Sequence, residues 1–97
     1  MLTGKQKRFL RKEAHHLKPV FQVGKGGVSA NLVKQTEEAL EARELIKLNI
    51  LQNNAEDKED TARQIAEGAG ADIVQIIGNT IILYKESKES KQITLPE

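Results

Sequence analysis

The residues with the clearest chemical potential in this chain of 97 residues form one short loop, Gly24-Lys25-Gly26-Gly27. The loop follows a strand-like apolar run at residues 20–23 and precedes Ser29, a residue type that often caps the start of a helix. Free N–H groups at a helix N-terminus attract anions, and glycines let a nucleic-acid backbone approach closely. This GxxG loop therefore favours phosphate binding. Taken alone, it fits a simple turn between a strand and a helix equally well.

The chain before this loop is strongly basic. Residues 1–27 contain seven Lys or Arg residues and one acid, a net charge of +6, whereas residues 28–97 contain eight basic and thirteen acidic residues, a net charge of −5. At about 100° per residue, a helix over residues 3–17 has an apolar arc formed by Leu2, Phe9, Leu10, Ala14 and Leu17. The opposite arc is cationic and carries Lys5, Lys7, Arg8, Arg11, Lys12 and His15. Charged faces are usually just solvated, but such faces more often mix charge signs, so this pattern favours a polyanionic partner.

The amino-acid composition argues against several other classes of protein. Charged residues make up 30% of the chain and hydrophobic residues 38%, as in soluble globular domains. The absence of cysteine excludes disulfides and thiolate metal sites and favours the cytosol. The sequence shows no signal-peptide pattern and no apolar run near the roughly 18 residues of a membrane helix. We therefore expect a cytoplasmic protein with no membrane partner.

Enzyme chemistry has little support in the residue pattern. His15 and His16 diverge by about 100° on a helix and cannot easily share a metal ion. The acids between residues 56 and 60 fit a helix start better than an acid–base pair. Aromatic residues are few, which argues against a base-stacking platform and points to backbone and shape recognition. We expect no catalytic site, metal, cofactor or small-molecule substrate.

Hydrophobic spacing and turn residues predict the element order α-β-α-β-α-β-β. Helices are expected near residues 3–17, 30–42 and 57–67, and strands near residues 20–23, 45–51, 72–77 and 80–85. Helical crossovers imply parallel or mixed strand pairing. The predicted fold class is therefore α/β, a compact domain in which helices cover a four-stranded mixed sheet.

Local signals mark several boundaries of these elements. Thr3 and Gln6 have the spacing of a capping box, and Gly68 and Gly70 are expected to end the third helix. Gly78-Asn79 predicts a hairpin turn between the last two strands. Both of these strands are apolar on both faces in places, so each is expected to be central or covered. We expect the domain to span residues 1–86, followed by a polar, flexible tail at residues 87–97.

Several blocks of the sequence together resemble one protein family. The blocks are Leu2-Thr3-Gly4-Lys5-Gln6-Lys7-Arg8-Phe9-Leu10-Arg11, Ala14-His15-His16-Leu17-Lys18-Pro19, the GxxG loop, Ala39-Leu40-Glu41, Glu44-Leu45-Ile46-Lys47, Ile76-Ile77-Gly78-Asn79 and Leu83-Tyr84-Lys85. In this order they closely resemble the bacterial YhbY-like proteins, which are stand-alone CRM (chloroplast RNA splicing and ribosome maturation) domains. The resemblance covers residues 1–85 and is far more specific than a GxxG loop alone.

The resemblance implies an RNA-binding protein with a fold like the C-terminal domain of bacterial translation initiation factor three. It also implies association with precursors of the large ribosomal subunit and its RNA; plant relatives act in intron splicing. The RNA-binding residues it implies here are Lys5, Lys7, Arg8, Arg11, Lys12, His15, Lys18, Gly24, Lys25, Gly26 and Gly27. We expect a monomer. A protein-interaction module that uses the acidic helix faces, or a general nucleic-acid-binding factor, remains the alternative.

Overall fold

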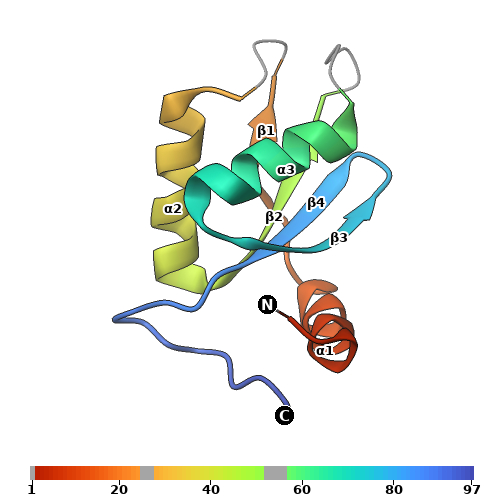
Figure 1. Cartoon of the computed structure of the whole chain (residues 1–97), viewed down its shortest axis with the longest axis vertical. Helices are drawn as coiled ribbons and strands as arrows, with labels where there is room; N and C mark the ends of the chain where they lie inside the picture. Colours follow the sequence, from red (N-terminus) through yellow and green to blue (C-terminus); the bar gives the residue numbers. More distant parts are fainter. Residues whose placement is uncertain (1, 25–27, 52–56) are drawn as a thin grey trace.

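The computed structural model describes residues 2–24, 28–51 and 57–97. The helices are α1 (Gly4–Ala14), α2 (Ala30–Arg43) and α3 (Lys58–Ala69), and the strands are β1 (Pro19–Val23), β2 (Leu45–Ile50), β3 (Asp72–Ile77) and β4 (Thr80–Tyr84). Their order along the chain is the predicted one (Figure 1). The mixed α/β class is therefore confirmed, while the likeness to the initiation-factor domain stays a prediction.

The four strands form one mixed sheet in the order β1-β2-β4-β3. β1 pairs with β2 in parallel, as expected for strands joined by a helical crossover, and β4 is antiparallel to both β2 and β3. The hairpin between β3 and β4 turns at Gly78, which has a φ of 55°. β4 is central, and β3 lies at the edge of the sheet but is covered on both faces, since Ile73 and Ile76 pack against the main core and Val74 lies in the cluster beneath α1. Ile77 at the end of β3 is 54% exposed.

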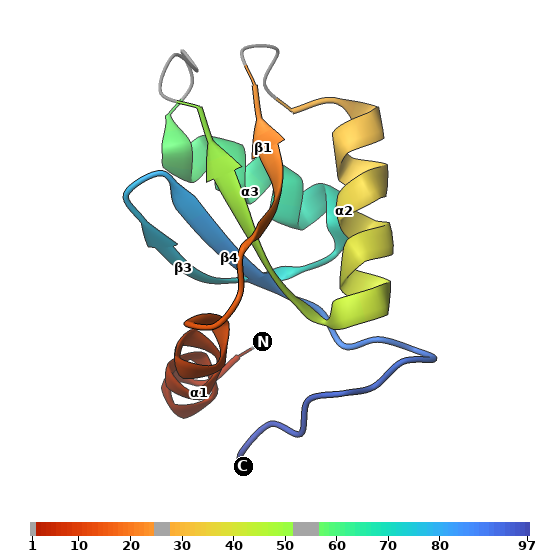
Figure 2. The same ribbon diagram turned by 180° about the vertical axis from the view of Figure 1, so that it is seen from behind.

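Helices cover the two faces of the sheet unequally. α2 and α3 pack together over one face, where Leu40 and Ile65 meet Ile46, Leu48 and Ile81 in a buried core (Figure 1). α1 lies against one end of the opposite face (Figure 2), where its Leu10 and Ala14 form a second buried cluster that includes Leu45, Val74, Ile82 and Tyr84. The basic helix is thus attached through its apolar side, and its other side is free to face solvent.

The predicted helix signals have clear outcomes. The Thr3–Gln6 capping box is present, since the Gln6 N–H donates to Thr3 Oγ1 at 3.1 Å and the Thr3 N–H donates to Gln6 Oε1 at 3.0 Å. α1 ends at Ala14, earlier than expected; His15 caps it with helical backbone angles, and its N–H donates to the Lys12 carbonyl at 3.3 Å. Gly70 ends α3 in the left-handed conformation as predicted.

The expectation that Gly68 helps to end α3 is wrong. Gly68 lies inside the helix, and a Cβ atom there would come within 3.0 Å of Val33 Cγ1 on α2. Such a distance is tighter than nearly all real Cβ contacts. The glycine therefore lets α2 and α3 approach closely, a packing role that local sequence signals do not distinguish from helix termination.

The segment after β4, for which the sequence predicts a flexible tail, packs against the rest of the domain in the structure. It runs past the end of α2 and back toward α1 (Figure 1). Ile93 and Leu95 pack against the cluster beneath α1. Near the chain end, Gln6 Nε2 donates to the Pro96 carbonyl at 3.1 Å and Lys5 Nζ to the Glu97 carbonyl at 3.2 Å. These contacts combine apolar burial with hydrogen bonding, and a polar composition alone gave no sign of either.

Glu44, the residue after α2, anchors this segment. Its side chain is fully buried and accepts backbone N–H groups from Ser87 at 2.8 Å, Gln92 at 2.6 Å and Ile93 at 2.8 Å. Burial raises the pKa of Glu44, but these hydrogen bonds lower it by more, so the net pKa lies below its usual value. Glu44 also has a φ of 66°, a left-handed value that favours glycine. The hydrogen bonds of the Glu44 carboxylate therefore explain why a glutamate occupies a backbone conformation that favours glycine.

Glu41 holds the same segment one helical turn earlier. Its carboxylate accepts the Ser87 hydroxyl at 2.7 Å and the backbone N–H groups of Lys88 and Glu89, both at 3.1 Å. The Lys88 N–H, followed by the Ser87 hydroxyl, lowers the pKa of Glu41. Together the two glutamates bind the backbone of residues 87–93, and we call them and this segment the tail clasp.

None of the helices in the described ranges combines the length and apolar character needed to cross a membrane.

Candidate nucleic-acid interface

The cations of α1 lie on its solvent side, as the helical pattern predicts. Leu10 and Ala14 are fully buried, and Phe9 and Leu17 are half-buried against the same cluster. Arg11 is partly exposed, and the remaining basic positions of this region are exposed: Lys5, Lys7, Arg8, Lys12, His15 and Lys18. We call these seven residues the α1 cationic face. Arg11 and Lys12 also lie in the last turn of α1, where positive charge is favourable beside the helix dipole.

The charge of the α1 cationic face is almost uncompensated. Among the described residues, the ion pairs are Arg63–Asp60 at 2.9 Å and Lys91–Glu86 at 2.8 Å, and neither involves α1. Lys5 donates to a backbone carbonyl oxygen; the other six members of the face have no hydrogen bond or ion pair from their side chains within the described part of the chain. An exposed group of cations in this state attracts anions without first giving up a protein partner.

The structure does not bring the α1 cationic face close to Gly24, the one residue of the GxxG loop that it describes. Lys18 directly precedes β1, whereas Gly24 directly follows it, and six residues of extended chain span about 20 Å. Figure 2 shows α1 beside the beginning of β1 and the far end of the strand pointing away from it. Lys25, Gly26 and Gly27 lie outside the described residues. The described residues of the predicted site therefore lie in two separate places, one at each end of β1.

The described residues around the loop form a well-defined strand end and helix start. The Leu51 N–H donates to the Val23 carbonyl at 3.0 Å, which holds the end of β1 beside β2. Ser29 caps α2 as predicted, accepting the Leu32 N–H on its hydroxyl at 3.0 Å. Among the described residues, a Cβ at Gly24 would meet Leu51 Cδ1 at 3.9 Å, an ordinary van der Waals distance.

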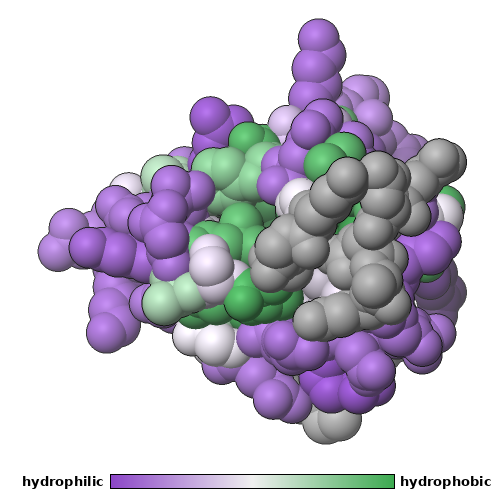
Figure 3. All heavy atoms as spheres, turned by 90° about the horizontal axis from the view of Figure 1, so that it is seen from above, coloured by the Kyte–Doolittle hydropathy of each residue, from purple (hydrophilic) through white to green (hydrophobic). Residues whose placement is uncertain are grey.

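This end of the molecule is more apolar than α1. Seen from above, hydrophobic surface lies among hydrophilic side chains over the start of α2 (Figure 3). Leu51 is 40% exposed, and Val28 and Leu32 are half-buried against the main core. The positive helix end and its surroundings thus provide few charges of their own, in contrast to the α1 cationic face.

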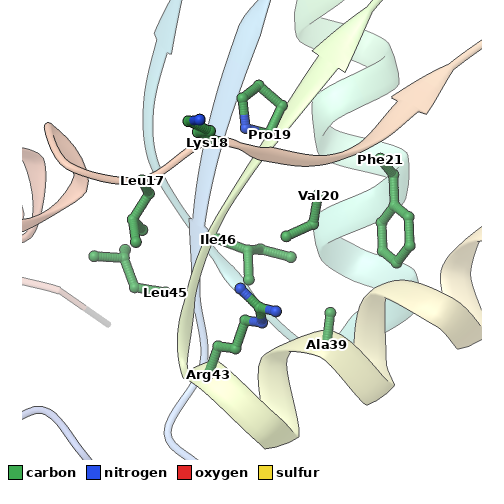
Figure 4. Close-up of a pocket in the computed structure, with 9 residues that line it drawn as sticks. All are labelled: Leu17, Lys18, Pro19, Val20, Phe21, Ala39, Arg43, Leu45 and Ile46. Carbon is green, nitrogen blue, oxygen red and sulfur yellow. The ribbon is translucent and has the colours of Figure 1, made fainter.

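A groove adjoins the α1 cationic face where the chain enters β1. It is lined on one side by Leu17, Lys18, Pro19, Val20 and Phe21, and on the other by Ala39, Arg43, Leu45 and Ile46 (Figure 4). Sequence reasoning included Lys18 in the site but missed Arg43. No sequence signal marked it, because only the parallel pairing of β1 with β2 brings the end of α2 beside residue 18.

Ionisable groups suited to other chemistry are dispersed. Within the residues that the structure describes, no three His, Cys, Asp or Glu side chains come together in a way that could hold a metal ion. His15 and His16 are both exposed at the end of α1.

Together, these features define a small α/β domain with a one-sided cationic surface. Residues 2–85 match the CRS1 / YhbY (CRM) domain, and the chain belongs to this family. The family resemblance seen in the sequence blocks is therefore confirmed.

Two relatives and one solved structure are similar over almost the whole chain. The Bacillus subtilis "Probable RNA-binding protein YqeI" is 68% identical over 96 residues, covering 99% of this chain and 100% of the relative. A Haemophilus influenzae "RNA-binding protein" is 39% identical over 95 residues, covering 98% of this chain and 95% of the relative. The solution structure of a hypothetical protein from Staphylococcus aureus has a TM-score of 0.83 at 53% identity, covering 99% of this chain and 100% of that one.

Proposed function

We propose that this protein binds RNA and that the α1 cationic face contacts the RNA phosphates. The observation that carries the proposal is the exposed group of cations on α1 that lack ion pairs within the described residues. Relatives named as RNA-binding proteins support RNA as the polyanion. The scarcity of exposed aromatic side chains favours recognition of backbone and shape. The protein acts as a binding factor and not as an enzyme.

The GxxG loop provides a second contact in this proposal. Bare glycines at residues 24, 26 and 27 let the RNA backbone lie against the N-terminal end of α2, and Lys25 adds one positive charge. Because Lys18 and Gly24 are separated by the length of β1, an RNA that reaches both parts must extend along this strand. The supporting observation is the exposed start of α2 at Ser29 and Ala30 directly after the loop.

In the cell, the proposed RNA is a precursor of the large ribosomal subunit. This part rests on the family to which the chain belongs. A cytoplasmic monomer that joins immature particles fits the small size and the one-sided charge. Such a protein should sediment with immature large-subunit particles in low-salt gradients, and its deletion should cause these particles to accumulate, most clearly in the cold. Normal subunit profiles without co-sedimentation would contradict the ribosomal role.

Charge reversal tests the RNA-binding face directly. Replacing Arg8, Arg11 and Lys12 by Glu should lower RNA affinity at least about a hundredfold and flatten its salt dependence by roughly 0.7–0.9 for each phosphate that the variant no longer binds. Fluorescence anisotropy at several salt concentrations measures both quantities. A variant with Glu at Lys34, Lys58 and Lys88 carries the same net charge change on exposed positions outside α1 that form no ion pair among the described residues, and it serves as the control. Equal reductions of affinity in the two variants, with circular dichroism unchanged, would reject α1 as the binding face.

A further inference from the structure

The groove beside the start of β1 is lined by both apolar and charged side chains. Its apolar residues include Leu17, Val20 and Phe21, and the buried Leu45 and Ile46 lie beneath them (Figure 4). Phe21 contributes a half-buried aromatic ring at one end. The groove is also the meeting place of two elements, since β1 forms one wall and the last turns of α2 form the other. A groove of mixed lining between two such elements can cover one side of a ring with apolar side chains and leave its polar edge to the cations.

Two cations from opposite walls border this hollow. Lys18 and Arg43 are both exposed, and neither side chain has a hydrogen bond or ion pair within the described part of the chain. The Arg43 guanidinium extends from α2 over Ile46 toward β1 (Figure 4). Among the described residues, no Asp or Glu lines the groove, although residues 28–97 carry a net negative charge. The combination of an apolar floor and unpaired cations matches a base with its phosphate.

We propose that this groove binds one unpaired nucleotide of RNA, with the base against the apolar walls and the phosphate at Arg43 and Lys18. The inference rests on the proposed function and adds to it a class of ligand and a new contact residue. Its position supports it, because Lys18 belongs to the α1 cationic face and also lines the groove. An RNA strand held on α1 therefore reaches the groove without leaving positive surface. Arg43 supplies a planar group that can bind a phosphate through two hydrogen bonds.

A base inside a duplex cannot enter the groove, since it is already stacked and paired. The groove thus predicts a preference for unpaired RNA that the exposed α1 cationic face cannot provide by charge alone. Stacking against an aromatic or apolar wall depends little on base identity. The proposal therefore concerns RNA structure and not RNA sequence.

Alanine substitution at Arg43 separates this site from α1. Arg43→Ala should weaken binding of a short single-stranded oligouridylate about tenfold, which corresponds to about 1.4 kcal/mol, and weaken binding of a blunt RNA duplex of equal length by less than about twofold. Arg43→Lys should recover part of the affinity because lysine keeps the charge but not the paired hydrogen bonds. Lys34→Ala is the matched control: it removes one exposed cation from the same helix, nine residues away and on the opposite side. It should change neither affinity.

Photocrosslinking supplies an independent measurement. Thiouridine-substituted single strands should crosslink to peptides containing residues 17–21 or 39–46, and the yield should fall in Arg43→Ala. Equal weakening for the single strand and the duplex would overturn the nucleotide pocket and make Arg43 an ordinary phosphate contact. Unchanged RNA affinity in Arg43→Ala would also overturn the nucleotide pocket and would favour a protein segment as the ligand of the groove. If only the α1 triple variant fails to bind RNA, the proposed function stands without the pocket; if both variants bind RNA like the parent, both proposals fail.

Discussion

The α1 cationic face and the tail clasp differ in whether their charged side chains have partners within the protein. In the α1 cationic face, six of the seven basic side chains have no hydrogen bond or ion pair to the described residues. In the tail clasp, Glu41 and Glu44 each accept three hydrogen bonds, and Glu44 is fully buried. The first region gains little for folding from its charges, whereas the second depends on them. Charge that is completely satisfied within the chain is structural, and charge that is left exposed is available to a ligand.

The energetic reason lies in desolvation. A carboxylate removed from water is costly unless hydrogen bonds replace the missing solvation. Backbone N–H groups of residues 87–93 supply these bonds, so the position of the tail and the charge of Glu44 are mutually dependent. Exposed lysines and arginines on α1 keep their water and incur no such cost. Mutations should therefore separate stability from binding cleanly between the two regions.

Removing residues 87–97 should have the largest effect on stability. The truncation uncovers the cluster that Ile93 and Leu95 pack against and leaves Glu44 without its donors, so the free energy of unfolding should fall by at least about 3 kcal/mol. Urea denaturation measures the decrease. The full chain with Ala at Lys88 and Lys91 is the control and should remain within about 0.5 kcal/mol of the parent. An unchanged urea midpoint in the truncated protein would show that the tail does not stabilise the domain.

Glu44→Ala should lower the free energy of unfolding by about 2 kcal/mol or more, since three backbone donors lose a charged acceptor. RNA affinity of the folded variant should change less than about twofold, because the Glu44 side chain is fully buried and cannot contact RNA. Glu44→Gly is the informative companion, since glycine relieves the backbone at a φ of 66° but lacks the same bonds. A glycine variant as stable as the parent would show that the hydrogen bonds of the Glu44 carboxylate contribute no net stability beyond offsetting the strained backbone.

Acid should weaken the tail clasp before it affects α1. The pKa values of Glu41 and Glu44 are lowered in the folded protein, so the stability that they contribute is complete above the unfolded value of about 4.3 and is lost as pH falls through the folded values. Denaturation midpoints measured from about pH 7 to about pH 3 should decline more steeply in the parent than in Glu44→Gln. Parallel profiles would indicate that other carboxylates control acid unfolding.

Neutral substitutions on α1 should leave stability almost unchanged. Arg8→Gln and Lys12→Gln remove exposed charges without touching the apolar side, so the free energy of unfolding should shift by less than about 0.5 kcal/mol. The salt dependence of RNA binding should nevertheless fall by roughly 0.7–0.9 for each phosphate left unbound. Destabilisation of either variant by more than about 1 kcal/mol would mean that the face contributes to folding.

Lys25→Ala should have the smallest effect of all. It removes one charge from the GxxG loop and should reduce the salt slope by the share of a single phosphate, roughly 0.7–0.9. Salt titrations by fluorescence anisotropy measure the change. Gly26→Asp adds bulk and a negative charge and should weaken RNA binding more, with its melting temperature measured alongside. A stable Gly26→Asp protein with unchanged RNA affinity would show that the loop is only a turn and does not contact RNA.

Regular elements were readable from the sequence because their signals are local. The capping box at Thr3 and Gln6, the cap at Ser29 and the turn at Gly78-Asn79 all depend on residues a few positions apart. Apolar spacing on α1 likewise predicted which side is buried. Each of these features follows from backbone geometry that any chain with the same local pattern would share.

Long-range features could not be read in the same way. The tail clasp joins a carboxylate to backbone N–H groups more than forty residues later, and backbone groups leave no mark in a sequence. Arg43 joins the candidate site only through the pairing of β1 with β2. The packing role of Gly68 and the edge position of β3 also depend on contacts between elements that are distant in the sequence. No sequence signal indicated that Gly24 and the α1 cationic face lie at opposite ends of β1; only the folded structure shows it.

The docking of α1 has a consequence for the order of events during synthesis. Leu10 and Ala14 are made early, but their buried partners Val74, Ile82 and Tyr84 lie far along the chain. At about 5–20 residues per second, translation needs about 4–14 s to get from Leu10 to Ile82. For that time the N-terminal segment is amphipathic, strongly positive and without its packing surface. The helix that we assign to RNA is therefore the part of the nascent protein that stays undocked longest beside the ribosome that makes it.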